Sequence, residues 1–158
     1  MRLWAEQSQS YSHGVEQPVG VLFVCLGNIC RSPMAEAVFR SLVEKKGLAS
    51  RFEISSCGTG DWNVGKPPHP GTRRILDELG ISYEGMRAKV YDAPTILSYD
   101  YIVAMDRSNR ADLQTMGVPG QRIHLLTDFI PGLEGSDVPD PYYDGRFRYV
   151  YELVDKGT

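Results

Sequence analysis

Hydrophobic and polar positions follow two different periods in the first part of the chain. Residues 21–24 form a continuous run of aliphatic, β-branched and aromatic residues, which is typical of a parallel strand that is buried on both faces. After Pro33 the apolar positions recur with a period of 3.6, and Gly47 is expected to end the helix that this period predicts. The apolar face of this helix comprises Ala35, Val38, Phe39, Leu42 and Val43.

The same alternation of strand and helix continues to the end of the chain. Pro70 and Gly80 are expected to start and end the second helix, and Ser108 is the expected cap of the third. Such alternation predicts an α/β fold of three layers, α/β/α, in which helices cover both faces of a central four-stranded parallel sheet. The further predicted strands are residues 52–55, 101–105 and 123–126, and the further predicted helices are residues 70–79, 108–116 and 147–154.

The length of 158 residues suits a single domain, which we expect to span residues 19–158. Residues 1–18 are polar and have no apolar period, so they are predicted to form a flexible N-terminal tail. This segment lacks the apolar stretch of a secretory signal. No apolar run in the sequence reaches the roughly 18 residues of a membrane span.

Charge and cysteine content narrow the class of protein. The 17 Lys and Arg residues and 20 Asp and Glu residues give a net charge of −3, which provides no overall attraction for nucleic acid. Cys25, Cys30 and Cys57 are an odd number of cysteines, which does not suit a secreted disulfide framework, so we expect a cytoplasmic protein. Cys57 is interpreted as a small buried hydrophobic residue. Because neither cysteines nor histidines have zinc-site spacing, no metal or cofactor is predicted.

The segment of residues 25–33, with the sequence CLGNICRSP, connects the first strand to the first helix. In a doubly wound sheet a ligand binds beyond the carboxyl ends of the strands, which is where this segment lies. Its backbone N–H groups lead into a helix N-terminus, which attracts anions. Gly27 and Asn28 tolerate the positive φ that a loop needs to curl its amides around a phosphate, and Pro33 suits the first helical position.

Three side chains of this segment have the chemistry of phosphoryl transfer. A helix N-terminus favours the thiolate form of a cysteine, so Cys25 is the candidate nucleophile. Arg31 has a planar guanidinium that can bind two phosphoryl oxygens at once, and Ser32 can donate a hydrogen bond to the Cys25 sulfur. For Cys25 alone the alternative is a buried cysteine without a catalytic role, but the complete segment favours catalysis.

A thiolate that attacks phosphorus needs a second group that gives a proton to the leaving oxygen. Asp140 is the candidate, because Pro139 and Pro141 restrict its backbone and so fix the direction of its carboxyl group. The same carboxyl can then act as the base for the water that hydrolyses a phosphocysteine intermediate. The structural alternative for Asp140 is an Asx turn before a proline.

The segments of residues 24–33 (VCLGNICRSP) and 140–143 (DPYY) together resemble the low-molecular-weight protein tyrosine phosphatase family. The resemblance extends over about residues 19–152 and includes Ser56 and the segments of residues 59–62 and 104–109. It implies a doubly wound, flavodoxin-like topology and a hydrolase that acts on phosphotyrosine proteins without a metal. Inorganic phosphate is then expected as product or inhibitor.

The resemblance also implies roles for individual residues. Cys25 would be the nucleophile, Arg31 the phosphate clamp and Asp140 the general acid and base. Cys30 would form a reversible disulfide with Cys25 under oxidation, and Asp106 would lie near the site. Without the resemblance, Asp106 is expected to cap the helix from Arg107 or to tie down the loop. The implied substrate-binding positions are Leu26, Gly27, Ile29 and Cys30 through backbone amides, Asn28 and Ser32 through hydrogen bonds that shape the loop, and Trp62 and Tyr142 through aromatic rings that flank the substrate ring.

The sequence departs from the family at one position, and other activities on similar folds stay open. Family members commonly have a histidine that braces the phosphate loop through a serine like Ser56, whereas this chain has Met86, so the support of the loop must be made differently. A protein arginine phosphatase is one alternative, although that subfamily has threonine at the position of Ile29. An arsenate reductase would need further cysteines after Cys57, and a non-catalytic phosphocarrier would not need a general acid.

Overall fold

The computed structural model describes residues 17–158, so most of the predicted tail, residues 1–16, lies outside the described residues. Four parallel strands form one sheet in the order β2-β1-β3-β4. This sheet confirms the predicted α/β fold and its doubly wound topology. The strands are β1 (Val19–Cys25), β2 (Phe52–Gly58), β3 (Tyr101–Ala104) and β4 (Ile123–Leu125).

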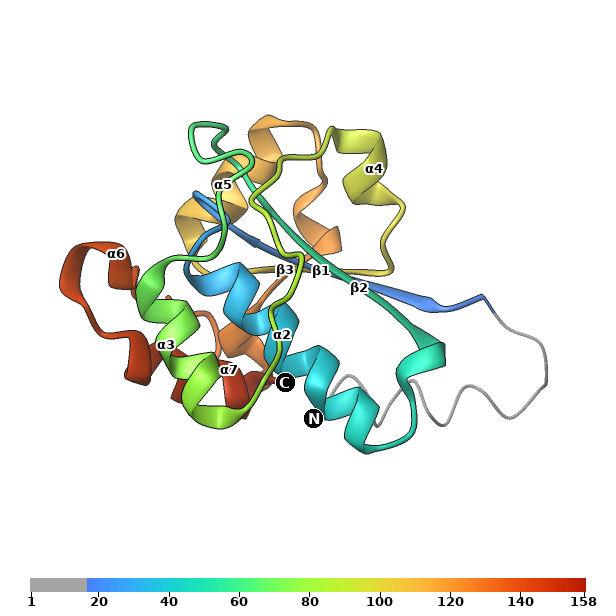
Figure 1. Ribbon diagram of the computed structural model, residues 1–158. Coiled ribbons are helices and arrows are strands. Elements are labelled where there is room, and N and C mark those ends of the chain that lie inside the picture. The colour runs from blue at the N-terminus through green and yellow to red at the C-terminus, as the bar shows by residue number, and fades with distance from the viewer. Residues whose placement is uncertain (1–16) are drawn as a thin grey trace.

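Helices cover both faces of the sheet, which gives the predicted three layers (Figure 1). The central strands β1 and β3 are apolar on both faces because each face packs against a helix layer. One layer contains α2 (Arg31–Lys45), α3 (Pro70–Leu79) and α7 (Phe147–Gly157), and the other contains α4 (Ala93–Leu97) and α5 (Arg107–Thr115).

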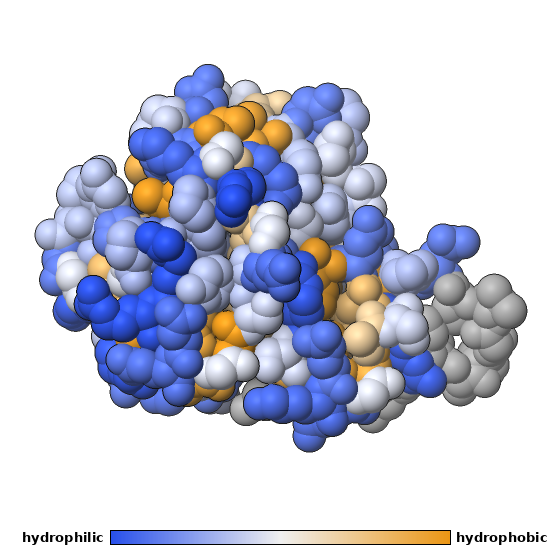
Figure 2. All heavy atoms as spheres, viewed as in Figure 1, coloured by the Kyte–Doolittle hydropathy of each residue, from blue (hydrophilic) through white to orange (hydrophobic). Residues whose placement is uncertain are grey.

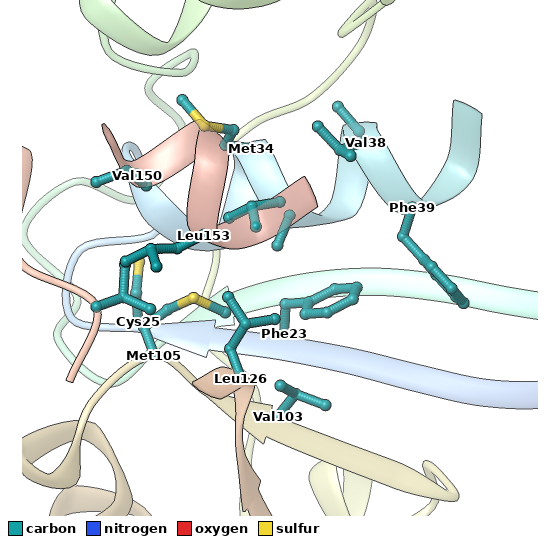
Figure 3. Close-up of a cluster of buried hydrophobic side chains, with 14 of the residues drawn as sticks. Phe23, Cys25, Met34, Val38, Phe39, Val103, Met105, Leu126, Val150 and Leu153 are labelled. Atoms are coloured by element: carbon teal, nitrogen blue, oxygen red, sulfur yellow. The ribbon is translucent and has the colours of Figure 1, made fainter. Parts of the chain in front are cut away.

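Alternate residues of β1 contribute to the two cores. Val21 and Phe23 are buried on the α2 side of the sheet, whereas Leu22 and Val24 are buried on the α5 side. Figure 3 shows the α2-side cluster, with Cys25 at its edge where β1 ends. The apolar contacts of β1 therefore fix the position of the residue that begins the predicted anion-binding segment.

The structure corrects the predicted starts of two helices. Helix α2 begins at Arg31 and not at Pro33, so that Arg31 and Ser32 belong to its first turn. Helix α5 begins at Arg107, and its cap is not Ser108 but Asp106, which confirms the capping role expected of Asp106. The carboxylate of Asp106 accepts a hydrogen bond from the backbone N–H of Asn109 at 2.6 Å, which satisfies one of the free amides of the first turn.

Several short elements have no counterpart among the predictions. Helices α4 and α6 (Pro141–Asp144) and the 3-10 helices η2 (Ala49–Arg51), η3 (Gly120–Arg122) and η4 (Leu126–Phe129) are too short to display a period in the sequence. Both α4 and α6 follow a capping aspartate and have a proline in their first turn, at the second position in α4 (Pro94) and at the first in α6 (Pro141). Helix α7 also runs to Gly157, beyond the predicted end at residue 154.

The surface shown in Figure 2 is dominated by hydrophilic residues, and its hydrophobic residues form small separated groups. Within the described residues, no helix combines the length and the apolar character needed to cross a bilayer.

Strand β1 lies between β2 and β3, so the chain leaves β1 toward one side of the sheet and later returns on the other. In such sheets the carboxyl end of the strand at this reversal opens a crevice in which ligands bind. Residues 26–30 occupy this position, and α6 lies at the same end of the molecule (Figure 1).

Candidate active site

The loop of residues 26–30 turns its backbone amides toward a cavity. Asn28 has a φ of 56°, and it is the one non-glycine residue with positive φ between residues 17 and 158. Because the C=O and N–H of a trans peptide unit point in opposite directions, carbonyls that bond outward leave the amides of the following residues facing the cavity. The outward carbonyls are those of Leu26, Ile29 and Cys30, which accept from Gly60 N at 2.9 Å, His69 N at 2.7 Å and Thr72 Oγ1 at 3.0 Å.

Cys25 lies at the base of this cavity, where its sulfur meets a hydroxyl group. The residue is 2% exposed, and its Sγ is 3.0 Å from Ser32 Oγ in the first turn of α2. A hydroxyl at this distance can donate to a thiolate, which stabilises the charged form of the sulfur. The structure thus places the predicted pair as the sequence analysis expected.

Asn28 and Ser32 lie behind the loop and not on the cavity, where they hold the shape of the loop. Asn28 Nδ2 donates to Ser32 Oγ at 2.8 Å and to Ser56 Oγ at 3.0 Å, and Asn28 Oδ1 accepts from the backbone N–H of Lys89 at 2.9 Å. Asn28, Ser32 and Ser56 are all buried, so these bonds replace contacts with water. The side chain of Asn28 thereby stabilises the strained backbone on which it stands.

The support that the family commonly obtains from a histidine comes here from Glu36 in α2. Ser56 Oγ donates to Glu36 Oε1 at 2.6 Å, and Glu36 is only 5% exposed. Met86 is buried and lines a small space together with Glu36 and Ser56. The expectation that the loop is supported differently is therefore met by a buried carboxylate.

Arg31 is held rigidly with one edge of its guanidinium left for an anion. Its Nη1 donates to Asp106 Oδ2 at 2.6 Å and to the carbonyl of Val138 at 3.0 Å. Its Nη2 has only a long contact of 3.4 Å with Asp140, and its buried Nε has no partner among the described residues. Nε and Nη2 form the edge that can bind two oxygens of a phosphoryl group.

The electrostatics of Arg31 favour this function. Burial works to lower the pKa of the guanidinium, but the neighbouring Cys25 charge and the bond to Asp106 outweigh it, so the pKa of Arg31 is raised above its usual value. Arg31 therefore carries a permanent positive charge beside the sulfur. A fixed charge of this kind stabilises negative charge that develops on a phosphoryl group.

Asp140 caps α6 and also lies on the wall of the cavity. Its Oδ1 accepts from the backbone N–H of Tyr142 at 3.0 Å, which is the Asx-type cap of α6. Its Oδ2 lies 3.4 Å from Arg31 Nη2, on the wall of the same cavity as Cys25. The cap fixes one oxygen and so directs the other toward the site.

The cavity has a volume of about 410 Å³, and aromatic rings form part of its lining. Trp62 is 62% exposed and Tyr142 is 59% exposed, although both are large aromatic residues. Gly60 permits this position of Trp62, because a Cβ on Gly60 would collide with the Trp62 ring. Exposed aromatic rings around a concave site are typical of a binding surface for an apolar group.

Cys30 and Cys57 differ from Cys25 in their environment. All three cysteines are free thiols in the structure. Burial, followed by the charge of Cys25, raises the pKa of Cys57 to about 12, and the same two causes raise the pKa of Cys30. Both groups therefore stay protonated near neutral pH, and Cys57, with no exposed surface, is the buried hydrophobic residue predicted from the sequence.

His69 joins the loop to the segment that carries Asp140. Its backbone N–H binds the loop carbonyl of Ile29, and its Nδ1 accepts from Gly71 N at 3.0 Å at the start of α3. Its ring stacks on Phe147 with centroids 5.0 Å apart and meets Tyr142 edge to face at 5.8 Å. Burial and then Arg73 lower the pKa of His69, which favours the neutral ring that Nδ1 needs in order to accept a hydrogen bond.

The structure brings most of the predicted residues to one cavity and adds others. The cavity is lined by the predicted residues Cys25, Leu26, Gly27, Ile29, Cys30, Arg31, Trp62, Asp140 and Tyr142, together with Asn63, Lys66 and Tyr143. Asn63 and Lys66 had no signal in the sequence, because polar residues in a loop are usually solvated. Glu36 did have one, since it interrupts an otherwise small and apolar stretch of α2.

A loop of amides that holds a thiol beside a buried guanidinium defines a cysteine-dependent enzyme of phosphoryl transfer. Comparison with protein families narrows this class. Residues 20–158 match the family described as "Low molecular weight phosphotyrosine protein phosphatase", so the chain belongs to this family. The predicted class of enzyme, a protein tyrosine phosphatase and hence a hydrolase, is confirmed.

Individual relatives agree with this membership. The low molecular weight protein-tyrosine-phosphatase YfkJ of Bacillus subtilis is 47% identical over 141 residues, which cover 88% of this chain and 90% of YfkJ. The crystal structure of YfkJ matches with a TM-score of 0.87 and covers 91% of this chain and 92% of that one, at 46% identity. A Drosophila arginine phosphatase matches with a TM-score of 0.78 at 34% identity and covers 87% of this chain and 91% of its own.

Proposed function

We propose that this phosphatase hydrolyses phosphotyrosine in proteins through a phosphocysteine intermediate on Cys25, with Arg31 as the phosphate clamp and Asp140 as the general acid and base. The observation that carries the proposal is the free Nε edge of Arg31 next to a sulfur that lies 3.0 Å from a hydroxyl donor. A phosphoryl group bound there would be held by the guanidinium and by the loop amides of Gly27, Cys30 and Arg31.

The proposed reaction has two steps. In the first, the Cys25 thiolate forms a bond to phosphorus, the bond to the tyrosine oxygen breaks, and Asp140 gives its proton to that oxygen. In the second, Asp140 takes a proton from a water molecule, the water oxygen bonds to phosphorus, and the bond from sulfur to phosphorus breaks. Inorganic phosphate leaves, and the thiolate and the protonated Asp140 are restored. Arg31 and the loop amides stabilise the charge on the phosphoryl oxygens in both steps.

The rim of the cavity supports an aryl substrate. Trp62 and Tyr142 present apolar ring faces at the cavity, and a phenyl ring bound between them would lose water from both of its faces. An alkyl phosphate such as phosphoserine offers no ring to these surfaces. Since a Drosophila arginine phosphatase has a similar fold, phosphoarginine is the substrate that most needs a direct comparison.

A substrate panel tests the proposal. The protein is expected to hydrolyse a phosphotyrosine peptide faster than phosphoserine or phosphoarginine peptides of the same sequence, measured as kcat/KM by phosphate release. Ile29→Thr is expected to change the ratio of phosphoarginine to phosphotyrosine turnover by about tenfold in favour of phosphoarginine, because a hydroxyl then replaces apolar surface in the cavity. Ile29→Val, which keeps an apolar β-branched side chain, is the matched control.

Faster turnover of the phosphoarginine peptide by the unaltered protein would replace phosphotyrosine as the proposed substrate. An unchanged ratio in Ile29→Thr would show that Ile29 does not select between the two.

Asp106 offers a test of the Arg31 clamp, because its carboxylate has two separate contacts. One is the bond to Arg31 Nη1, and the other is the cap of α5 through Asn109 N. Asp106→Asn retains a good cap but removes the charge next to Arg31, so kcat/KM is expected to fall about tenfold while the melting temperature stays nearly constant. Asp106→Ala is expected to lose about 1 kcal/mol of unfolding free energy in addition. Equal activity of Asp106→Asn and the unaltered protein would show that Arg31 does not depend on this bond.

We also propose that residues 19–158 act as one domain in the cytoplasm on phosphotyrosine-containing protein substrates, with inorganic phosphate as the product. The three free thiols suit a reducing compartment, and a net charge of −3 gives no general affinity for nucleic acid.

A further inference from the structure

The side chain of Glu36 is a buried charge at one end of a chain of hydrogen bonds that reaches the Cys25 sulfur. Its Oε1 accepts from Ser56 Oγ at 2.6 Å, and its Oε2 forms an ion pair with Arg40. Arg40 also donates to the carbonyl of Ile54 at 3.1 Å, so the pair is anchored to β2. In this ion pair the Glu36 carboxylate has no proton to donate, so it can only accept hydrogen bonds.

This carboxylate determines where each proton of the chain lies. Ser56 has a single hydroxyl proton, and it must point to Glu36, so the Ser56 oxygen accepts from Asn28 Nδ2 at 3.0 Å. The amide of Asn28 cannot flip, because its Oδ1 accepts from the backbone N–H of Lys89 at 2.9 Å. Its second N–H therefore points to Ser32 Oγ at 2.8 Å.

Ser32 then has one direction left for its own proton. Its oxygen already accepts from Asn28, and the Cys25 Sγ lies 3.0 Å away. The Ser32 hydroxyl therefore donates to the sulfur, which is the orientation that stabilises a thiolate. The opposite orientation, with a thiol proton pointing to Ser32, would stabilise the unreactive form.

We infer that Glu36 is a positioning residue that fixes the direction of the hydrogen bonds from Ser56 through Asn28 to Ser32 and so holds the Ser32 proton on the Cys25 sulfur. Glu36 does not touch the cavity, and it acts only through the residues in between. The inference rests on the proposed role of Cys25 as nucleophile. It explains why Met86, which has no group that could accept from Ser56 as strongly, is compatible with an ordered loop.

The test is the Glu36→Gln variant, which keeps the size of the side chain but can accept a hydrogen bond at only one of its two ends. Arg40 is a donor and attracts the amide oxygen, so the amide N–H₂ turns toward Ser56 and the Ser56 proton loses its fixed acceptor. The pH at which iodoacetamide alkylates Cys25 half-maximally is expected to rise by about one unit, and kcat/KM below that pH is expected to fall about tenfold. Peptide mass identifies the alkylated cysteine.

Other titratable groups near Cys25 and Glu36 do not change the interpretation of this measurement. Arg31, Cys30 and Cys57 are the groups that interact with the Cys25 charge, Asp140 lies on the same cavity, and none of them is altered. Arg40 is paired with Glu36, and Arg87 lines the small space beside it. Cys30 and Cys57 stay protonated in the range of interest, because burial raises the pKa of both thiols.

Two further variants distinguish an effect that passes through the hydrogen bonds to Cys25 from a general loss of stability. Glu44→Gln changes an exposed glutamate of the same helix and is expected to leave the alkylation profile and the turnover unchanged. Ser56→Ala interrupts the series of hydrogen bonds one step closer to Cys25, so it is expected to raise the alkylation pH as Glu36→Gln does. The double variant Glu36→Gln/Ser56→Ala is expected to raise this pH no further than either single variant.

Additive shifts in the double variant, or a Glu36→Gln profile equal to that of the unaltered protein, would overturn the inference even if its melting temperature fell. A failure of the proposed function is distinguishable from this outcome, because it would appear as turnover that persists in Cys25→Ser.

Discussion

Cys25→Ser is expected to reduce the hydrolysis of p-nitrophenyl phosphate by at least about 10⁴-fold, because the serine hydroxyl stays protonated near neutral pH and no thiolate is available to attack phosphorus. The variant retains Arg31 and the loop amides, so it is expected to bind inorganic phosphate with nearly unchanged affinity. Steady-state kinetics and calorimetric titration with phosphate measure the two properties separately.

Cys57→Ala is the matched control for this experiment. Cys57 is a buried cysteine of β2 that does not line the cavity, so its loss is expected to change stability slightly and turnover little. Turnover that persists in Cys25→Ser, with or without an added metal ion, would falsify the assignment of the nucleophile.

Asp140→Asn is expected to lose about 10²- to 10³-fold in kcat with a phenyl phosphate ester, whose leaving oxygen needs a proton. Asparagine can still cap α6, so the position of the loop should be retained. With dinitrophenyl phosphate, whose leaving group needs no proton, the first turnover is expected to stay fast and to appear as a burst, because only the second step then lacks its base.

Asp144→Asn provides the comparison, since Asp144 lies in the same short helix and its carboxylate pairs with Arg146 away from the cavity. If Asp140→Asn showed the same loss with both leaving groups, Asp140 would act on the phosphoryl group and not as the proton donor.

The periodicity of the sequence predicted the main elements well where an element was long and uniformly apolar. The strand at residues 21–24 and the helix at residues 70–79 were found, the latter with its start at Pro70 and its cap at Gly80, because buried parallel strands and amphipathic helices have distinct patterns. The start of α2 was wrong because Arg31 and Ser32 are polar residues that are buried for the sake of the site. Polar residues inside a core do not follow the apolar period.

The chemistry of the site was predictable as far as it lay in one continuous segment. The residues of the loop stood out because a cysteine, an arginine and a serine rarely combine at this spacing between a buried strand and a helix, and Asp140 stood out because prolines flank it. The partners of these residues could not be predicted, because the contacts of Arg31 with Asp106 and of Ser56 with Glu36 join residues far apart in the chain. Only the fold shows which of many exposed or buried carboxylates reaches a particular guanidinium or hydroxyl.

The packing around His69 couples the position of α7 to the active-site loop. The nearest atoms of the Phe147 ring lie 2.5 Å from the position that a Cβ on Gly71 would occupy. The His69 ring contacts both this Phe147 ring and the Tyr142 ring. Helix α7 thus packs against the imidazole of His69, the residue whose backbone N–H binds the loop carbonyl of Ile29. A ligand or partner that tilts α7 would shift Asp140, the proposed proton donor, relative to the Cys25 sulfur, so a surface outside the cavity would influence the rate.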